Sequence, residues 1–145
     1  MTRLAEVLTS EDKKSRVVTD TLQIIDAEVA DKGGISGMAI KAGYKAVKGI
    51  RPGFLEKVVS DLLPEFADAV EPIYREAVEK SRPVRDYFVE NRARVADSLL
   101  AITDGRARRT KSGVVKATYD RLRGSAKKNV EEAVPRLGGL IEKHT

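Results

Sequence analysis

Carboxylate side chains are the residues of this chain with the clearest capacity for chemistry. Asp61, Glu65 and Asp68 are spaced by four and then three positions, so they share one face of a helix. Three such oxygen ligands could hold Mg²⁺ or Ca²⁺, but a di-metal carboxylate site normally adds Glu-x-x-His pairs, and the sequence has none. Pro64 also predicts a helix start, where the helix dipole favours acidic residues. We therefore expect no metal ion and no cofactor here.

Other kinds of catalytic centre lack their residues. The chain has no cysteine, which excludes disulfides, thiolate nucleophiles and cysteine zinc sites. Its only histidine, His144, is next to last, where chain ends are usually frayed, so we expect neither a catalytic base nor a Ser-His-Asp triad. The glycine-rich segment 33–37 lacks the Gly-Lys-Ser/Thr end of a phosphate-binding loop, and no G-x-G-x-x-G motif occurs. The sequence thus favours a protein that is not an enzyme.

Positive charge is concentrated in two segments. The formal net charge is +5, yet residues 105–129 hold nine basic residues and one acidic residue, and residues 33–53 hold four basic residues and no acidic one. Residues 54–90, in contrast, hold nine acidic and five basic residues. Helical spacing places several of the cations on common faces. The candidate anion-binding residues are Lys41, Lys45, Lys48, Arg106, Arg108, Arg109, Lys111, Lys116, Arg123 and Lys127.

Three interpretations of these basic segments stay open. They could meet a polyanion, either nucleic acid or an anionic membrane surface, because clustered Lys and Arg neutralise phosphates. They could instead meet the acidic segment 54–90, in the same chain or in another copy, and the latter would make a homo-oligomer. They could also be ordinary solvated helix faces. No zinc-finger, RNP1 or KH pattern is present to choose among these partners.

The elements that carry these residues are predicted to be helices throughout. Apolar residues recur at steps of three and four, and no sustained alternation of polar and apolar residues predicts a strand. The longest apolar stripe runs from Leu55 to Ala77, and we expect a kink or a break at Pro64 or Pro72 within it. The predicted fold class is all-α. It is a single compact domain over residues 1–145, with about six to eight helices, several of them short and broken by glycine or proline.

Local signals predict where several helices begin and end. A Thr-x-x-Asp capping box at Thr9 predicts a helix start, and Gly33-Gly34 predicts the end of that helix. The basic stretch 105–113 is the best loop candidate, and Ser112 is expected to cap the helix after it. Gly124-Ser125 is expected to divide the last helical region.

The stripes also predict a core. Replacing Leu62 or Phe66 by alanine is expected to cost roughly 2–5 kcal/mol of stability, because both lie on the longest stripe. The residues expected to be mostly buried are Val18, Leu22, Ile25, Leu55, Val59, Leu62, Phe66, Ile73, Leu99, Ile102, Leu122, Val134 and Leu137.

Length and composition indicate the setting of the protein. A chain of 145 residues can bury roughly 70% of its unfolded surface, so a core is feasible without cross-links. Hydrophobic content of 41% and charged content of 34% fit a soluble globular chain. No apolar run approaches the ~18 residues of a membrane span, and the N-terminus has no signal-peptide core. We expect a cytoplasmic protein without a transmembrane segment.

Four segments together resemble a known family. They are residues 25–32 (IDAEVADK), 44–48 (YKAVK), 62–67 (LLPEFA) and 134–142 (VPRLGGLIE). They are similar to an uncharacterised family of small helical proteins from actinobacteria, classed as a domain of unknown function. The resemblance covers most of the chain and implies a cytoplasmic bacterial setting. It supplies no functional residue.

Two functions of different classes are consistent with these observations. The first is a non-enzymatic helical binding or scaffolding module whose basic surface meets an anionic partner. The alternative is a carrier of a lipid or other apolar small molecule, held in a pocket between helices, because helices interrupted by Gly and Pro can leave a cavity between them. A continuous basic face would favour the first, and an apolar cavity with dispersed charge would favour the second.

Overall fold

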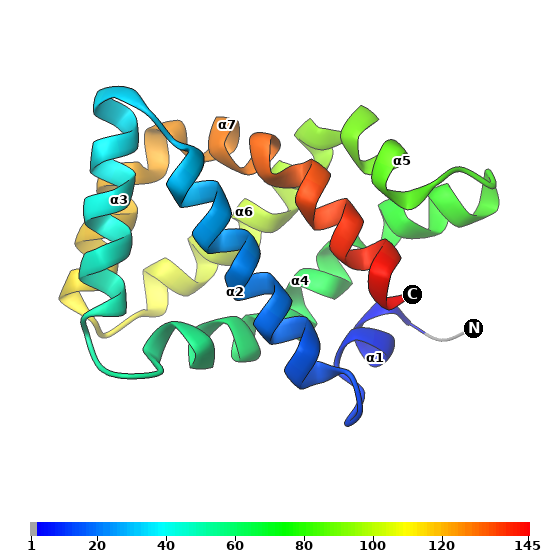
Figure 1. The fold of residues 1–145 in the computed structure, drawn as a ribbon, viewed down its shortest axis with the longest axis horizontal. Coiled ribbons are helices and arrows are strands. Elements are labelled where there is room, and N and C mark those ends of the chain that lie inside the picture. The colour runs from blue at the N-terminus through cyan, green and yellow to red at the C-terminus, as the bar shows by residue number, and fades with distance from the viewer. Residues whose placement is uncertain (1–2) are drawn as a thin grey trace.

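A computed structural model describes residues 3–145, which form seven helices and no strand (Figure 1). The all-α prediction is confirmed. The helices are α1 (Leu4–Leu8), α2 (Lys14–Asp31), α3 (Gly34–Lys48), α4 (Phe54–Glu79), α5 (Val84–Glu90), α6 (Arg92–Arg109) and α7 (Gly113–His144).

The two longest helices, α4 and α7, hold the others together. Helix α7 packs against α2, α3, α5 and α6, and α4 packs against α1, α2, α5 and α6. The short helix α1 and the end of α7 lie at the same end of the molecule (Figure 1). The backbone N–H of Leu4 donates to Glu71 Oε2 at 2.8 Å, which fixes α1 to α4.

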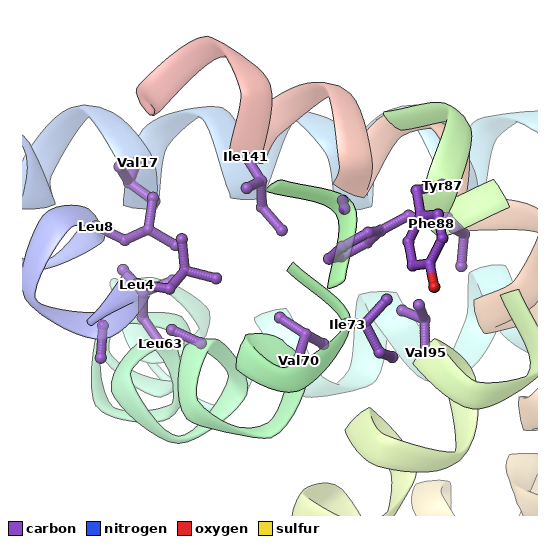
Figure 2. Close-up of a cluster of buried hydrophobic side chains, with 14 of the residues drawn as sticks. Leu4, Leu8, Val17, Leu63, Val70, Ile73, Tyr87, Phe88, Val95 and Ile141 are labelled. Carbon is purple, nitrogen blue, oxygen red and sulfur yellow. The ribbon is translucent and has the colours of Figure 1, made fainter. Parts of the chain in front are cut away.

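The buried core joins side chains from α1, α2, α4, α5, α6 and α7 (Figure 2). Burial of apolar surface is the main force that holds such helices together, since most helical stability in proteins comes from packing of an apolar face. The largest side chains that are almost completely buried are Phe88, Leu4, Val17, Val95 and Val134.

Only part of the predicted core is fully buried. Val18, Val59, Ile73 and Val134 are buried, whereas the other nine predicted residues are half-buried. In α4 the fully buried positions include Leu63 and Ala67, which follow the predicted Leu62 and Phe66 by one residue. Neighbouring residues of a helix lie about 100° apart around its axis. A shift of one residue therefore changes which side chains of the helix face the core.

Prolines and glycines interrupt the helices less than expected. Helix α4 runs unbroken through Pro64 and Pro72, so of the predicted kink or break the break does not occur. Helix α7 runs through Gly124 and Pro135, so the predicted division at Gly124-Ser125 is wrong. An interior proline costs about 3 kcal/mol in an isolated helix. Here α4 and α7 each pack against several neighbours, and that packing outweighs the local preference.

Two predicted boundaries also need correction. The capping box at Thr9 does not form, because Thr9 Oγ1 donates to the Ala5 carbonyl and the next helix begins at Lys14. The 105–113 loop is shorter than expected, because α6 continues through Gly105 to Arg109. Arginines in a last helical turn are favoured by the helix dipole. Ser112 does cap α7, since its Oγ accepts from the Val115 N–H at 3.3 Å.

A close approach between helices explains one glycine. Gly43 lies in the interior of α3, where glycine lowers helix stability by about 1 kcal/mol relative to alanine. A Cβ atom at this position would lie 2.8 Å from Thr118 Cγ2 and 3.2 Å from Leu122 Cδ1 of α7. Gly43 therefore lets α3 lie close against α7.

The C-terminal end is ordered, so the expectation of fraying at His144 is wrong. His144 is 7% exposed, its Nε2 lies 2.8 Å from Asp20 Oδ2, and its carbonyl accepts from Lys13 Nζ at 2.8 Å. Hydrogen bonds from Lys143 and His144 lower the pKa of Asp20. These contacts attach the end of α7 to the first turns of α2.

Glu76 connects α4 to α5 and α6. Arg94 donates to both of its carboxylate oxygens, at 2.8 and 3.0 Å, and the Tyr87 hydroxyl donates to Oε1 at 2.6 Å. The Arg94 and Tyr87 hydrogen bonds lower the pKa of Glu76 to about 2. Because the folded chain favours the ionised carboxylate, this group contributes its full stabilisation above its ordinary pKa of 4.5 and loses it as the pH falls towards 2.

We predict that Glu76→Gln lowers the melting temperature at pH 7 and that its difference from the wild type disappears near pH 2. The measurement is a series of thermal melts from pH 7 to pH 2 on both proteins. Asp61→Asn is a suitable control, because within residues 3–145 the ion-pair partner of Asp61 is the exposed Lys57 of the preceding turn. A Glu76→Gln difference that stays constant over this pH range would contradict the role of the carboxylate charge.

Candidate functional site

An apolar cavity of about 350 Å³ lies between α2, α4, α6 and α7. Single residues of α1, α3 and α5 complete its wall, at Leu8, Ile40 and Phe88. The wall is almost entirely apolar. Its volume falls within the range of about 300–1,000 Å³ that is usual for small-molecule sites.

The spacing of apolar residues on each helix produces this wall. Helix α2, with Lys32 directly after its end, contributes side chains at steps of three and four from Thr21 to Lys32, and α7 does so from Asn129 to Ile141. Small residues, Ala67 in α4 and Ala133 in α7, face the same space. An alanine at such a position leaves a volume that a larger side chain would fill, so the helices do not close upon this space.

Four of the nine predicted core residues that are only half-buried gain an explanation from the cavity. Ile25, Phe66, Leu99 and Leu137 all line it. Their side chains lie between helices, as the stripes predict, but one side of each faces empty space. Half-burial at these positions thus marks the cavity wall.

Polar groups in the wall are satisfied by the protein itself. The Thr21 hydroxyl donates to the Val17 carbonyl at 2.7 Å, and the Thr103 hydroxyl lies within hydrogen-bond distance of the Leu100 carbonyl and the Tyr119 hydroxyl. Across residues 3–145, every buried side-chain nitrogen or oxygen has a hydrogen-bond partner. The interior therefore offers apolar contact to an occupant and no unsatisfied polar group.

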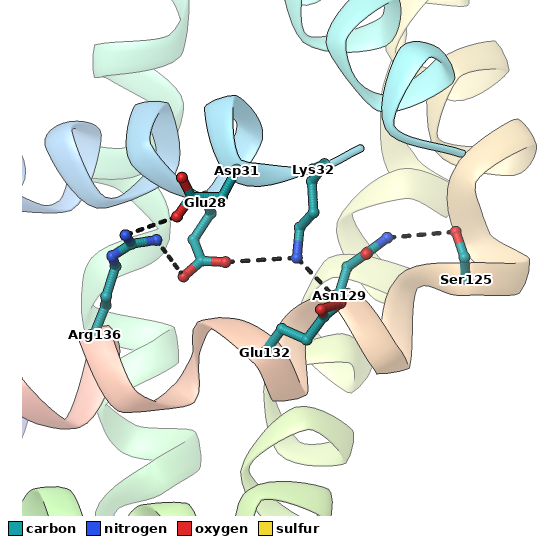
Figure 3. Close-up of polar contacts among 7 residues, drawn as sticks. All are labelled: Glu28, Asp31, Lys32, Ser125, Asn129, Glu132 and Arg136. Carbon is teal, nitrogen blue, oxygen red and sulfur yellow. Dashed lines mark hydrogen bonds and ion pairs between the residues drawn. The ribbon is translucent and has the colours of Figure 1, made fainter. Parts of the chain in front are cut away.

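A polar cluster borders the cavity between α2 and α7 (Figure 3). Lys32 lies 3.5 Å from Glu28 Oε2 and 3.3 Å from Glu132 Oε1, and Arg136 donates to Glu28 at 2.8 Å and to Asp31 at 2.9 Å. The Glu28 and Lys32 side chains are only 14% and 12% exposed, whereas Glu132 is 50% exposed. The cluster thus extends from the cavity wall to the surface.

Four of the ten candidate anion-binding residues already have an acidic partner. Lys48 lies 3.9 Å from Asp26, and Lys127 lies 3.1 Å from Asp97. Arg106 pairs with Glu65, and Arg123 lies 2.8 Å from Asp104 Oδ1. Only Arg106 among them reaches the acidic segment 54–90.

Asp104 also holds the neighbouring Tyr119. The Tyr119 hydroxyl donates to Asp104 Oδ1, and hydrogen bonds from Arg123 and Tyr119 lower the pKa of Asp104. Burial and the Asp104 carboxylate raise the pKa of Tyr119. Arg123 is thus part of a contact between α6 and α7.

The other six candidates are exposed. No ion pair joins any of them to another residue of the described part of the chain. They are Lys41, Lys45, Arg108, Arg109, Lys111 and Lys116. Arg109 and Val47 border one hollow, so the α6–α7 connection lies beside the second half of α3.

The three carboxylates on α4 do not form a separate acidic site. Asp61 pairs with Lys57 at 2.9 Å, and Glu65 pairs with Arg106. Among residues 3–145, no group of three or more acidic or histidine side chains has an arrangement that could hold a metal ion.

Comparison with known families adds one match. Residues 4–145 match the model of DUF6918, described as a family of unknown function. The chain belongs to this family. No curated protein and no solved structure matches this DUF6918 chain. Within its described residues, none of the helices combines the length and the apolar character that crossing a membrane requires.

The sequence of this DUF6918 chain indicates the basic residues as a candidate site, whereas it indicates four residues of the cavity wall, Ile25, Phe66, Leu99 and Leu137, only as core residues. The carrier alternative places a pocket between helices but names no residue for it. One signal was available, because Ala67 and Ala133 lie on the apolar faces of the two longest helices. The polar cluster could not be found in this way, since Lys32 and Glu132 are 100 residues apart.

Proposed function

We propose that this DUF6918 protein is a carrier that binds an apolar small molecule, or the single hydrocarbon chain of a lipid, in the cavity between α2, α4, α6 and α7. The observation that supports this proposal is the cavity of about 350 Å³ with its almost purely apolar wall. Protein interiors are normally close-packed, so a void of this size and character is unusual in a small helical protein.

The energetic cost of an empty cavity favours an occupant. Cavities left by core truncations cost roughly 24 cal/mol for each Å³, so an apolar space that nothing fills lowers the stability of the folded chain. Apolar voids do not hold water well, because water there finds no polar partner. A hydrocarbon occupant would regain the missing dispersion contacts and would leave bulk water.

The polar cluster suggests how an amphiphilic ligand would be oriented. Its chain would lie among Ile25, Phe66 and Leu137, and its polar end would lie near Glu28, Lys32 and Asn129. The two charged groups in the wall, Glu28 and Lys32, lie 3.5 Å apart and neutralise each other.

We predict that a single-chain amphiphile binds with a stoichiometry of one and stabilises the fold. A ligand present at 100 times its Kd adds about 2.7 kcal/mol, which corresponds to a rise of about 5–10 °C in melting temperature for a chain of this size. The measurements are a titration with the fluorescent fatty acid cis-parinaric acid, displacement of that probe by dodecanol, and thermal melts with and without dodecanol.

The control for this experiment is Val114→Ser, which changes an exposed apolar residue outside the cavity and should leave both measurements unchanged. Linear binding without saturation, together with an unchanged melting temperature, would contradict the carrier proposal. A mass spectrum of the organic extract of the purified protein would identify any ligand that remains bound.

A second candidate function is binding of a nucleic acid by the α6–α7 connection. It is supported by the four exposed cations there that form no ion pair within residues 3–145, which are Arg108, Arg109, Lys111 and Lys116. In this case the chain would act as a binding or scaffolding module. The resemblance noted above supports a cytoplasmic setting for either function, and a single domain over residues 1–145 fits both.

For this second function we predict a steep dependence of binding on salt. Each phosphate contact releases about 0.7–0.9 counterion, so binding to an oligonucleotide should weaken strongly between about 50 and 200 mM salt. Replacing Arg108, Arg109 and Lys111 by serine should flatten this dependence at little cost in stability. The matched control replaces Lys57, Arg82 and Lys143, which are paired with acidic residues. Equal effects of the two triple variants, or no binding at low salt, would contradict this function.

A further inference from the structure

The first turn of α3 exposes two large apolar side chains. Ile35 is 89% exposed and Met38 is 71% exposed, and they lie three residues apart, on the same side of the helix. The other large apolar residues that are exposed within residues 3–145, Val78 and Val114, are about half exposed and lie on different helices. Single exposed apolar residues are common on proteins, but Ile35 and Met38 are an adjacent pair and are the most exposed large apolar residues within residues 3–145.

Lysine residues continue this exposed side of α3. Steps of three and four lead from Ile35 through Met38 and Ala42 to Lys45, and all four residues are exposed. Lys41 lies at the edge of the same side. Neither lysine has an ion pair with a described residue, and the segment 33–53 contains no acidic residue. We name Ile35, Met38, Lys41 and Lys45 the α3 face.

The opposite side of α3 is fixed against the protein. A Cβ atom at Gly43 would meet Thr118 and Leu122 of α7, and a Cβ atom at Gly37 would lie 2.6 Å from the backbone carbonyl carbon of Lys32. Both glycines are buried. This close packing holds the helix with the α3 face directed away from the protein.

We propose that the α3 face docks the chain onto an anionic lipid membrane. Ile35 and Met38 enter the boundary between headgroups and acyl chains, and Lys41 and Lys45 contact lipid phosphates. An amphipathic helix with apolar side chains on one side and flanking lysines lies in the plane of such an interface. The proposal stands apart from the carrier function, because it rests on different residues.

Charge complementarity selects the membrane over two other partners. A second copy of the chain seated on this face would bring Lys41 and Lys45 close to their own counterparts, with no acidic residue in segment 33–53 to balance them. A nucleic acid would contact the lysines but would give Ile35 and Met38 little apolar surface. An anionic bilayer satisfies both halves of the face at once.

The position of α3 also relates the membrane to the cavity. Lys32, which lines the cavity, is separated from α3 by the single residue Gly33. Helix α3 then begins at Gly34, whose φ is +69°. The first turn of α3 therefore lies beside the polar cluster at the edge of the cavity. A chain docked by the α3 face would hold this edge close to the bilayer.

The proposal is tested by co-sedimentation with vesicles of phosphatidylglycerol and phosphatidylcholine and with vesicles of phosphatidylcholine alone. Wild-type chain is expected to bind the first and not the second. Ile35→Ser with Met38→Ser should weaken binding at least tenfold, and Lys41→Gln with Lys45→Gln should weaken it by more than tenfold, since each lysine near an anionic surface contributes about fivefold. All four residues are exposed, so melting temperatures should stay unchanged.

Two matched controls accompany these variants. Val78→Ser with Val114→Ser removes two other exposed apolar residues, and Lys111→Gln with Lys116→Gln removes two other exposed lysines. Both should bind as the wild type does. Because the chain has no cysteine, Ile35→Cys and Val78→Cys can each carry one environment-sensitive fluorophore. Only the label at position 35 should shift to the blue on binding to vesicles.

Several results would overturn the proposal. One is an absence of binding to the anionic vesicles at low salt, and another is unchanged binding after Ile35→Ser with Met38→Ser. Equal losses in the control variants would assign binding to the whole basic surface. Self-association that Met38→Ser removes would identify a second copy as the partner. A failure to bind dodecanol would contradict the carrier function and would leave the membrane proposal unaffected, so the two failures can be distinguished.

Discussion

Ala133→Leu is expected to raise the thermal stability of the chain and to abolish binding of the apolar ligand. Ala133 lies in α7, is half-buried and lines the cavity. A leucine there would extend into the void and remove apolar surface from water or empty space, at about 0.8 kcal/mol for each methylene group buried. We expect a gain of about 1–2 kcal/mol, or about 3–6 °C in melting temperature.

The same substitution should weaken binding of cis-parinaric acid at least tenfold, because the new side chain occupies part of the ligand's space. Ala101→Leu is the matched control, since Ala101 is exposed on α6 and does not line the cavity. It should change neither quantity appreciably. If Ala133 served only to pack the core, its replacement by leucine could not both raise the melting temperature and weaken ligand binding. A fall in melting temperature with binding retained would show that Ala133 does not face an open cavity.

The helical fold could be predicted from the sequence because it depends on local pattern. Apolar residues at steps of three and four indicate a helix wherever they occur, and Ser112 is a local signal that acts within its own turn. Local signals failed where tertiary packing opposes them. Helices α4 and α7 pass through prolines, and α6 passes through Gly105, because neighbouring helices stabilise them.

The candidate site was harder to predict because it depends on distances between helices. The spacing of Ile25 and Leu137 predicts that they are core residues, and only the structure places them on the wall of a cavity. The ion pair of Arg106 with Glu65 joins residues 41 positions apart, so no local pattern could predict that Arg106 has a partner. The exposure of Ile35 was equally hidden, since an apolar residue in a helix is expected to be buried.

Phe88→Ala is expected to cost about 3–5 kcal/mol of stability, whereas Phe66→Ala should cost no more than about 2 kcal/mol. The two substitutions remove the same atoms, so the difference comes from their surroundings. Both residues line the cavity, but Phe88 is only 1% exposed and belongs to the buried cluster (Figure 2). Phe66 is half-buried and lines the cavity, so one side of its ring already lacks contacts.

The sequence pattern predicts a large cost for Phe66→Ala, because Phe66 lies on the long apolar stripe of α4, whereas the structure predicts the smaller of the two costs. Denaturant unfolding of both variants, in the absence of ligand, measures the two costs directly. Dodecanol should then bring the two costs closer together, because in the wild type it completes the contacts of Phe66. A bound ligand should raise the cost of Phe66→Ala towards that of Phe88→Ala. Equal costs for the two variants without ligand would mean that Phe66 is packed as tightly as Phe88, and the cavity beside it would then be closed.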